Sequence, residues 1–597
     1  MLRNLKIALS LLTLGAFLTA GIVSCSQKEP IEQEYPWWLE DDEENPGGDD
    51  PSGPDEPIPG GDEEDQGGGT EPIYAKDGQN FMGTVTCNGL GVAGVVVTDG
   101  VNFYRTDHSG RYWLPGKVSS TDFVYISIPS GYEVATDATY GIVPQFYKKV
   151  NKSGSAPQTF NFTLTKVDQT NYTLLTLTDQ HIQNRNIATI TSGKSKITTN
   201  DRDAYANNCV SYLKTYANGL KSKGRVYGLC MGDMTMYEYW AGSYNANYAY
   251  YLNASKNLGF PVFHIIGNHD HADGSSMTDY MAAEQYRVYF GPTYYSFNIG
   301  DRHIIGLDNM EVTQDNAREY DAATEPGGYK IRLGTAQLNW LKKDVASMSK
   351  KVKEVILLTH VPMAHWTAPG SNTANVSANI YHDQSEFNQI SALLSKYKVR
   401  IFSGHDHICQ NFNISTNMVQ HIHPAICGIY WYTWMCSDGT PAGSVEYSVS
   451  GDSFQRKLVP FWSYYRNNPG YIVYSNKVKT STGITVYNKN QDSTGAIEGG
   501  DPCILVNFCI WHPSWKIQVY EGDQPGAGAM VWRCDLDARK AMENGEVNLV
   551  ASSWLGVSTN LHMFQYTPVK TSSKITLLVT DENGKMIFNI PDIQVTL

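Results

Sequence analysis

The stretch Leu174-Leu175-Thr176-Leu177-Thr178-Asp179-Gln180-His181 decides the fold of this 597-residue chain. Its first five residues are apolar or β-branched and predict a buried strand. Asp179 and His181 then follow, two residues apart, on the loop that leaves the strand. A carboxylate and an imidazole so placed offer oxygen and nitrogen ligands that suit a divalent transition metal. One such pair is a weak signal, and it gains weight because further pairs of this kind follow later strands.

Four more clusters of Asp, Asn or His come directly after predicted strands. The strands cover residues 225–229, 262–266, 354–359 and 400–403, and the clusters are Met231-Gly232-Asp233, Gly267-Asn268-His269-Asp270, His360 and Gly404-His405-Asp406-His407. Each cluster alone has an ordinary explanation, which is a common turn or, for His360, a hydrogen-bonded core histidine. Five in succession indicate one metal site, because ligands of α/β proteins gather at the carboxyl ends of strands.

Helical patterns separate these strands. They cover residues 201–220, 244–257, 276–289, 335–348 and 384–396. Strands that alternate with helices of this length predict an α/β domain with largely parallel, buried strands.

The order D-x-H, G-D, G-N-H-D, H and G-H-x-H resembles the calcineurin-like metallophosphoesterase superfamily, over about residues 170–425. The resemblance implies a two-sheet α/β/β/α sandwich with a dinuclear metal centre between the strand ends. It also implies roles for eight residues. Asp179, His181 and His407 would hold the first ion, Asn268, His360 and His405 the second, Asp233 would bridge them, and His269 would protonate the leaving oxygen.

One position departs from the family pattern. The family often has a carboxylate or Asn three residues after the bridging Asp, which orients the acid histidine, and this chain has Met236 there. Asp270, Tyr237 and Glu238 remain candidates for that task. The Asp-Arg-Gly sequence of protein Ser/Thr phosphatases is also missing, which argues against a phosphoprotein phosphatase.

β-rich segments flank the catalytic domain, which is predicted over residues 168–427. Short alternating strands over 73–167 resemble a carboxypeptidase-regulatory-like β-sandwich, and a mostly-β domain is predicted over 428–597. The stretch Ile429-Tyr430-Trp431-Tyr432-Thr433-Trp434 is dense in aromatic residues where the two domains should meet. It is typical of a packing seam between domains, and it could also form a wall of a substrate cleft.

The N-terminal segments carry the charge imbalance. Residues 27–72 hold 17 acidic residues and one lysine, and residues 1–26 hold Arg3 and Lys6, so the net charge of −14 leaves the chain from Ile73 onward neutral. The neutral part has no basic excess, and nucleic-acid binding is not expected. We expect residues 25–72 to be a disordered linker. Residues 1–24 resemble a bacterial lipoprotein signal peptide, which would leave Cys25 lipidated.

These patterns predict a phosphoester hydrolase in the bacterial cell envelope, lipid-anchored through Cys25 and either periplasmic or surface-exposed. Two divalent ions of Mn, Fe or Zn would activate water against a small phosphomonoester. A phosphodiesterase acting on nucleotides or lipid headgroups is an alternative. A catalytically inert surface protein that binds glycan or peptide is a second alternative, from another class. The sequence predicts no oligomeric state.

Overall fold

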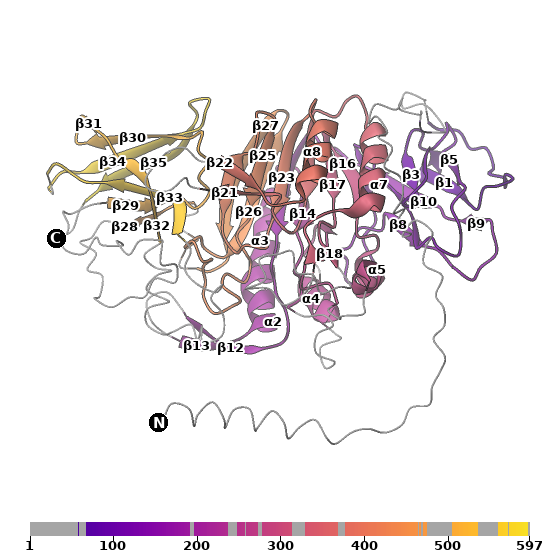
Figure 1. Ribbon diagram of the computed structural model, residues 1–597, viewed down its shortest axis with the longest axis horizontal. Coiled ribbons are helices and arrows are strands. Elements are labelled where there is room, and N and C mark those ends of the chain that lie inside the picture. Colours follow the sequence, from indigo (N-terminus) through magenta and orange to yellow (C-terminus); the bar gives the residue numbers. More distant parts are fainter. Residues whose placement is uncertain are drawn as a thin grey trace, which may run out of the picture. The chain divides into compact units, whose positions relative to one another are not determined.

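The computed structural model in Figure 1 describes most of the chain beyond residue 67. The described residues are 58, 67–190, 196–236, 247–256, 258–272, 278–312, 329–367, 377–463, 465–466, 470–474, 504–534, 559–570 and 572–594. The predicted signal peptide, Cys25, almost all of the predicted linker, Tyr237 and Glu238 lie outside them. The described residues all belong to one compact unit.

The predicted strand at residues 174–178 is the central strand of a five-stranded sheet. It is β11 (Asn171–Leu177), which pairs in parallel with β14 (Arg225–Cys230), and β14 pairs in parallel with β15 (Val262–His264). On its other side, β11 pairs antiparallel with β26 (Gly443–Ser450), which forms a hairpin with β27 (Ser453–Pro460). The central sheet therefore extends past the domain boundary predicted at residue 427.

A second sheet of six strands completes the core. Its order is β16 (Tyr295–Ile299), β17 (Arg302–Gly306), β20 (Glu354–Leu358), β23 (Lys398–Ser403), β25 (Met418–Ile422) and β24 (Gln410–Asn413). The inner strands β17, β20, β23 and β25 run parallel. Every residue of β17 and β20 is buried, as expected for strands covered on both faces.

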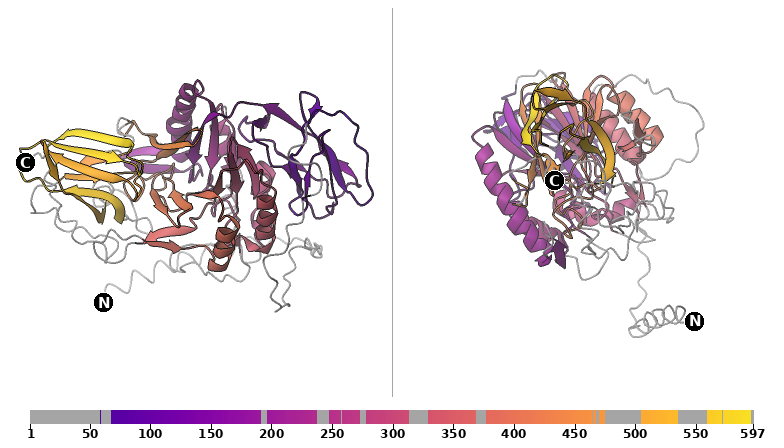
Figure 2. Two further views of the ribbon diagram at one scale, coloured as in Figure 1. Left: turned by 90° about the horizontal axis from the view of Figure 1, so that it is seen from above. Right: turned by 90° about the vertical axis from the view of Figure 1, so that its left-hand side faces the viewer.

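Helices cover the outer faces of the two sheets. Figure 2 shows α2 (Asp201–Ala204) and α3 (Ser211–Leu220) on one outer side, and α7 (Gly334–Ala346) and α8 (Gln384–Leu393) on the other. A six-residue π-helical segment, Tyr205–Val210, joins α2 to α3. The predicted α/β/β/α sandwich is confirmed.

The flanking segments are β-rich, as predicted. The N-terminal segment forms one sheet around β1 (Phe81–Cys87) and β10 (Phe162–Lys166). Its second sheet has the order β4 (Phe103–Arg105), β3 (Val96–Thr98), β6 (Phe123–Ile126) and β8 (Tyr147–Lys149). The C-terminal segment also forms two sheets. One is β28-β29-β33-β32, from Ile472–Tyr474, Ile504–Asn507, Thr559–Tyr566 and Ala529–Cys534, and the other is β31-β30-β34-β35, from Gln524–Gly526, Lys516–Glu521, Ile575–Thr580 and Met586–Ile593.

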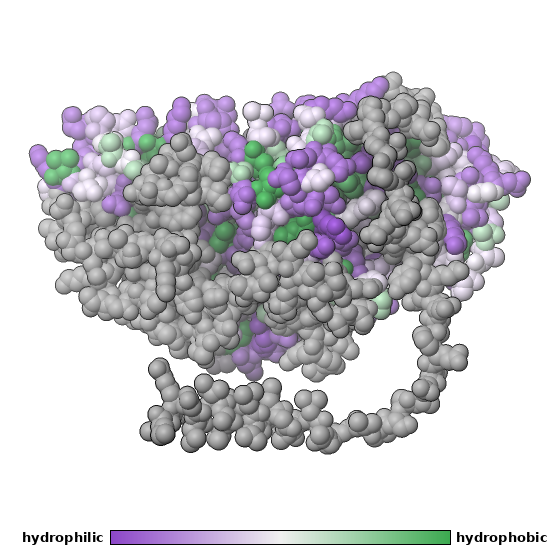
Figure 3. All heavy atoms as spheres, in the orientation of Figure 1, coloured by the Kyte–Doolittle hydropathy of each residue, from purple (hydrophilic) through white to green (hydrophobic). Residues whose placement is uncertain are grey.

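On the face shown in Figure 3, hydrophilic residues surround small, separate hydrophobic patches. Of the helices that the structure describes, none has the length and apolar character needed to cross a bilayer.

Candidate metal centre

The predicted ligands follow the carboxyl ends of strands β11, β14, β15, β20 and β23. Five of them adopt left-handed backbone conformations that non-glycine residues rarely occupy: Asp179 (φ 55°), His181 (47°), Asp233 (53°), His405 (70°) and His407 (52°). Each such residue costs of order 1 kcal/mol and persists where the surrounding structure holds it. This concentration at five predicted ligand positions is typical of functional sites.

The first group of predicted ligands is Asp179, His181 and His407. The Nε2 atoms of His181 and His407 lie 3.1 Å apart. The Oδ1 atom of Asp179 lies 3.7 Å from His181 Nε2 and 3.5 Å from His407 Nε2. All three side chains are buried, so their polar atoms face one another rather than water.

The second group is Asn268, His360 and His405. The Asn268 Oδ1 atom lies 2.9 Å from His360 Nε2 and 3.0 Å from His405 Nδ1. Asp233 lies between the two groups, with its Oδ2 atom 3.1 Å from His360 Nε2 and 3.6 Å from His181 Nε2. The structure thus brings all seven predicted ligands together and places Asp233 where a bridging carboxylate would lie.

Backbone carbonyl groups fix two of the imidazoles from behind. His360 Nδ1 lies 2.6 Å from the carbonyl oxygen of Met231, and His407 Nδ1 lies 2.6 Å from that of Gly428. A carbonyl can only accept, so each Nδ1 carries a proton, and in the neutral form of each ring the lone pair of Nε2 would face the centre. The Asp179 carboxylate is oriented in turn by the Thr178 hydroxyl, which donates to Oδ2 at 2.6 Å.

The electrostatics of the centre favour negative carboxylates. Burial opposes the ionised form of Asp233, but the charges of His360 and His269 hold the pKa of Asp233 well below its usual range. Burial likewise disfavours protonation of His360, yet the Asp233 carboxylate raises the pKa of His360 to about 9. Without another cation, His360 therefore supplies the positive charge that Asp233 requires.

His269, the predicted acid, lies beside the first group. Its Nδ1 is 2.6 Å from the carbonyl oxygen of Met236, and its backbone N–H donates to Asp233 Oδ1 at 2.9 Å. Its ring meets that of His181 edge-on, with the centroids 4.8 Å apart. The backbone carbonyl of Met236 thus contacts the histidine that, in the family pattern, a carboxylate or Asn at this position orients. Because burial lowers the pKa of His269 to about 3, its Nε2 is an acceptor at neutral pH.

Asp270, a candidate for orienting His269, connects two motif loops instead. Its carboxylate accepts hydrogen bonds from the backbone N–H groups of Gly267 at 2.9 Å and Thr235 at 3.2 Å. Burial, with the nearby charge of Asp233, raises the pKa of Asp270 to about 7. Asp270 therefore holds the loop after β14 against the loop after β15.

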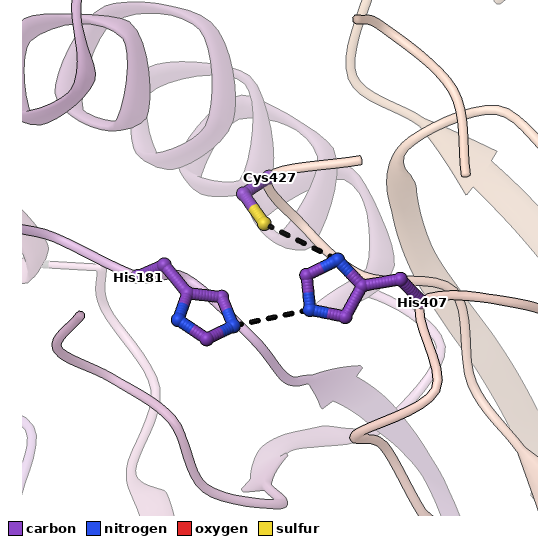
Figure 4. A group of neighbouring side chains, drawn as sticks. All are labelled: His181, His407 and Cys427. Carbon is purple, nitrogen blue, oxygen red and sulfur yellow. Dashed lines mark hydrogen bonds between the residues drawn. The ribbon is translucent and has the colours of Figure 1, made fainter. Parts of the chain in front are cut away.

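Cys427 lies near the first group but behind it (Figure 4). Its Sγ atom is 3.8 Å from Nδ1 of His407, whereas the Nε2 of His407 faces His181. One ion cannot contact both sides of the same ring. Cys427 therefore contacts His407 from behind, and its sulfur atom is not one of the predicted ligand atoms.

The aromatic stretch at residues 429–434 supports the same ligands. The ring of Tyr430 stacks on that of His407, with centroids 4.4 Å apart and planes 25° apart, and lies 4.7 Å from the ring of His181. The Trp431 indole N–H donates to the carbonyl oxygen of Gln180 at 2.9 Å. Sequence reasoning gave no metal-centre role to Gly428 or Tyr430. The signal available for Tyr430 was the density of aromatic residues at the predicted boundary of the catalytic domain.

Other histidines near the motifs have partners away from the centre. His271 lies 3.5 Å from Asp308, His365 2.8 Å from Asp406 and His382 3.0 Å from Glu386. His421 and His423 contact Asn411 and Tyr447. These contacts agree with the interpretation that none of the five is a ligand.

Comparisons with known proteins give three family matches in chain order. The family described as N terminal of calcineurin-like phosphoesterase matches residues 79–167, calcineurin-like phosphoesterase matches 173–409, and C terminal of calcineurin-like phosphoesterase matches 420–586. No curated protein sequence matches the chain.

Solved structures give weaker similarities. A dimetal phosphatase from Danio rerio is 12% identical over 48% of this chain and 95% of its own, with a TM-score of 0.31. A 5'-nucleotidase from Candida albicans is 12% identical over 50% of this chain and 54% of its own, with a TM-score of 0.30. An NAD nucleotidase from Haemophilus influenzae is 11% identical over 48% and 49%, with a TM-score of 0.25.

Proposed function

Because the chain belongs to the calcineurin-like phosphoesterase family of metal-dependent phosphoester hydrolases, we propose that it hydrolyses small phosphomonoesters at a centre of two divalent metal ions. Asp179, His181 and His407 would hold one ion and Asn268, His360 and His405 the other, with Asp233 shared between them. The observation that carries this proposal is the convergence of these seven side chains at one buried site.

The residues present fit two cations. The Nε2 lone pair of His407 faces Asp179 Oδ1 at 3.5 Å, and both atoms are acceptors when Nδ1 carries the proton. The Asn268 Oδ1 atom is another acceptor within this buried set. Buried acceptors that face one another repel unless a proton or a cation lies between them. Mixed oxygen and nitrogen donors suit Mn, Fe or Zn.

Two such ions, when bound, lower the pKa of water and neutralise phosphoryl charge. The side chains of this protein supply what surrounds that chemistry. Asp233 would balance the charge of the two ions. Asn268 would contribute a neutral oxygen, which keeps the ion that it holds electrophilic. His269 lies beside the first group. It would donate to the leaving oxygen in its protonated form, which burial disfavours in the protein alone.

Monoesters are proposed ahead of diesters, and a phosphodiesterase remains the second candidate. We also retain the proposal that Cys25 is lipidated and tethers the protein in the bacterial cell envelope. Its support is the apolar segment from Ile7 to Val23 followed by Ser24-Cys25.

The test compares p-nitrophenyl phosphate with bis-p-nitrophenyl phosphate as substrates of the Mn²⁺-supplemented protein. We expect turnover, faster with the monoester, and loss of turnover in Asp233→Ala. Faster turnover of the diester would favour the phosphodiesterase and contradict the monoesterase proposal. If the protein binds metal but Asp233→Ala leaves its activity unchanged, that result would contradict the assigned centre.

A further inference from the structure

A buried polar network connects the C-terminal β-sheets to the last ligand motif. It starts at His562 on β33 and Asn507 at the end of β29, where His562 Nδ1 lies 2.7 Å from Asn507 Oδ1. The other ring nitrogen of His562, Nε2, lies 3.1 Å from Oδ2 of Asp438. His562, Asn507 and Asp438 are each at most 2% exposed.

Asp438 is the centre of this network. Its Oδ2 atom, which contacts His562, also accepts the backbone N–H of Cys409 at 2.7 Å. Its Oδ1 atom accepts the backbone N–H of Thr440 at 2.9 Å. One carboxylate oxygen thus joins a side chain of the C-terminal sheets to the backbone two residues after His407.

A second contact holds the same loop. Ser437, which precedes Asp438, donates its backbone N–H to the carbonyl oxygen of His407 at 3.1 Å. The turn that contains Ser437 and Asp438 is closed by the backbone bond from Cys436 N–H to the Thr440 carbonyl oxygen, at 2.8 Å. The turn therefore contacts the ligand loop on both sides of Ile408.

These contacts act where the ligand loop is strained. His405 and His407 both have positive φ angles, and such conformations persist only where neighbouring structure holds them. The bond from Cys409 N–H to the Asp438 carboxyl group is one of the contacts that hold this loop.

From this geometry we propose that His562 is a positioning residue for the metal centre, acting through Asp438 on the loop that carries His405 and His407. The C-terminal sheets then form part of the support of the centre. This inference rests on the proposed function, since it assumes that these histidines bind metal.

The test measures Mn²⁺ binding to the full-length protein through the electron paramagnetic resonance signal of free Mn²⁺, without substrate. The variant is His562→Gln. The control is His303→Gln, because His303 is 2% exposed and lies 2.8 Å from the buried carboxylate of Asp344, between β17 and α7. Thermal unfolding of both variants reports the general loss of stability.

We expect His562→Gln to weaken Mn²⁺ binding by about tenfold or more, the usual effect of removing a group that supports ligands. Saturating Mn²⁺ should restore kcat, since His562 touches no reacting atom. His303→Gln should lower the melting temperature and leave Mn²⁺ affinity unchanged. Asn507→Ser removes the amide bonded to His562 Nδ1 and should also weaken Mn²⁺ binding, by less than His562→Gln does. It replaces His562→Gln if that variant does not fold.

If His562→Gln binds Mn²⁺ with wild-type affinity, the positioning role is overturned and the proposed function stays intact. The same holds for Asn507→Ser where it takes the place of His562→Gln. Equal weakening in His303→Gln would also overturn the positioning role, because binding would then follow stability alone. Wild-type protein that binds no Mn²⁺ would instead overturn the proposed function and this inference with it.

Discussion

The Nδ1 atom of His407 lies 2.6 Å from the carbonyl oxygen of Gly428, which has a φ of 58°. This contact fixes both the tautomer and the direction of one proposed ligand from outside its own loop. A side chain at residue 428 would meet backbone at once, because a Cβ atom would lie 2.7 Å from the carbonyl oxygens of Thr433 and Met435.

Gly428→Ala should therefore both destabilise the protein and weaken its metal binding. Gly451→Ala is the matched control, since Gly451 has a φ of 55° and an added Cβ there would meet no atom within 4 Å. We expect the control to cost about 1 kcal/mol for the backbone conformation alone. Urea denaturation and Mn²⁺ binding of both variants provide the measurement, and equal effects would contradict the account.

The stacking of Tyr430 on His407 predicts a difference between two substitutions. Tyr430→Phe keeps the ring and should retain Mn²⁺ affinity within about twofold, because the stacking of the ring on His407 is preserved. Tyr430→Ala removes the ring and should weaken binding by about tenfold. Titration with Mn²⁺ measures both, and equal losses in the two variants would assign the effect to the hydroxyl group instead.

His269 is expected to matter most for poor leaving groups. A positioned proton donor contributes about 10²–10⁴-fold when the leaving oxygen needs a proton, and far less for p-nitrophenolate. His269→Ala should therefore lower kcat/KM strongly with an alkyl phosphate and by less than about tenfold with p-nitrophenyl phosphate. Metal content of the variant should equal that of wild type. The same loss with both substrates would rule out the proton-donor role.

His264 predicts a pH dependence of stability. Its ring contacts the Tyr251 hydroxyl at 2.9 Å, and burial lowers the pKa of His264 to about 3. As pH falls below about 6.5, the unfolded chain takes up a proton that the folded chain excludes until about pH 3, so stability present at pH 7 is lost on acidification. Between pH 7 and pH 5 this loss is about 2 kcal/mol.

His264→Gln should remove that part of the loss while keeping a polar partner for Tyr251. Urea denaturation of wild type and variant at pH 7 and pH 5, both in EDTA so that metal release does not contribute, gives the comparison. An unchanged difference between the two pH values would show that His264 does not set the acid sensitivity.

The sequence predicted the core well because side-chain pattern carries the information there. The predicted strand 354–359 is β20 (Glu354–Leu358), and the predicted helix 335–348 is α7 (Gly334–Ala346). The seven proposed ligands could be placed together because Asp, Asn and His at successive strand ends leave a recognisable pattern.

The supports of the ligands were not predictable in this way. Gly428 and Met236 act through backbone carbonyl groups, which every residue possesses, so their sequence carries no signal. The pairing of β26 with β11 joins residues about 270 positions apart, and a local alternation pattern does not identify the partner of a strand. Asp438 and His562 likewise meet only through tertiary packing.

The most direct test of the central claim is the number of metal ions bound by the purified protein. Wild-type protein dialysed against Mn²⁺ and then against buffer should retain about two equivalents by inductively coupled plasma mass spectrometry, as expected for a two-metal centre. Asp233→Ala should retain fewer and hydrolyse no phosphoester. Wild-type protein that holds well under one equivalent would contradict the proposed centre.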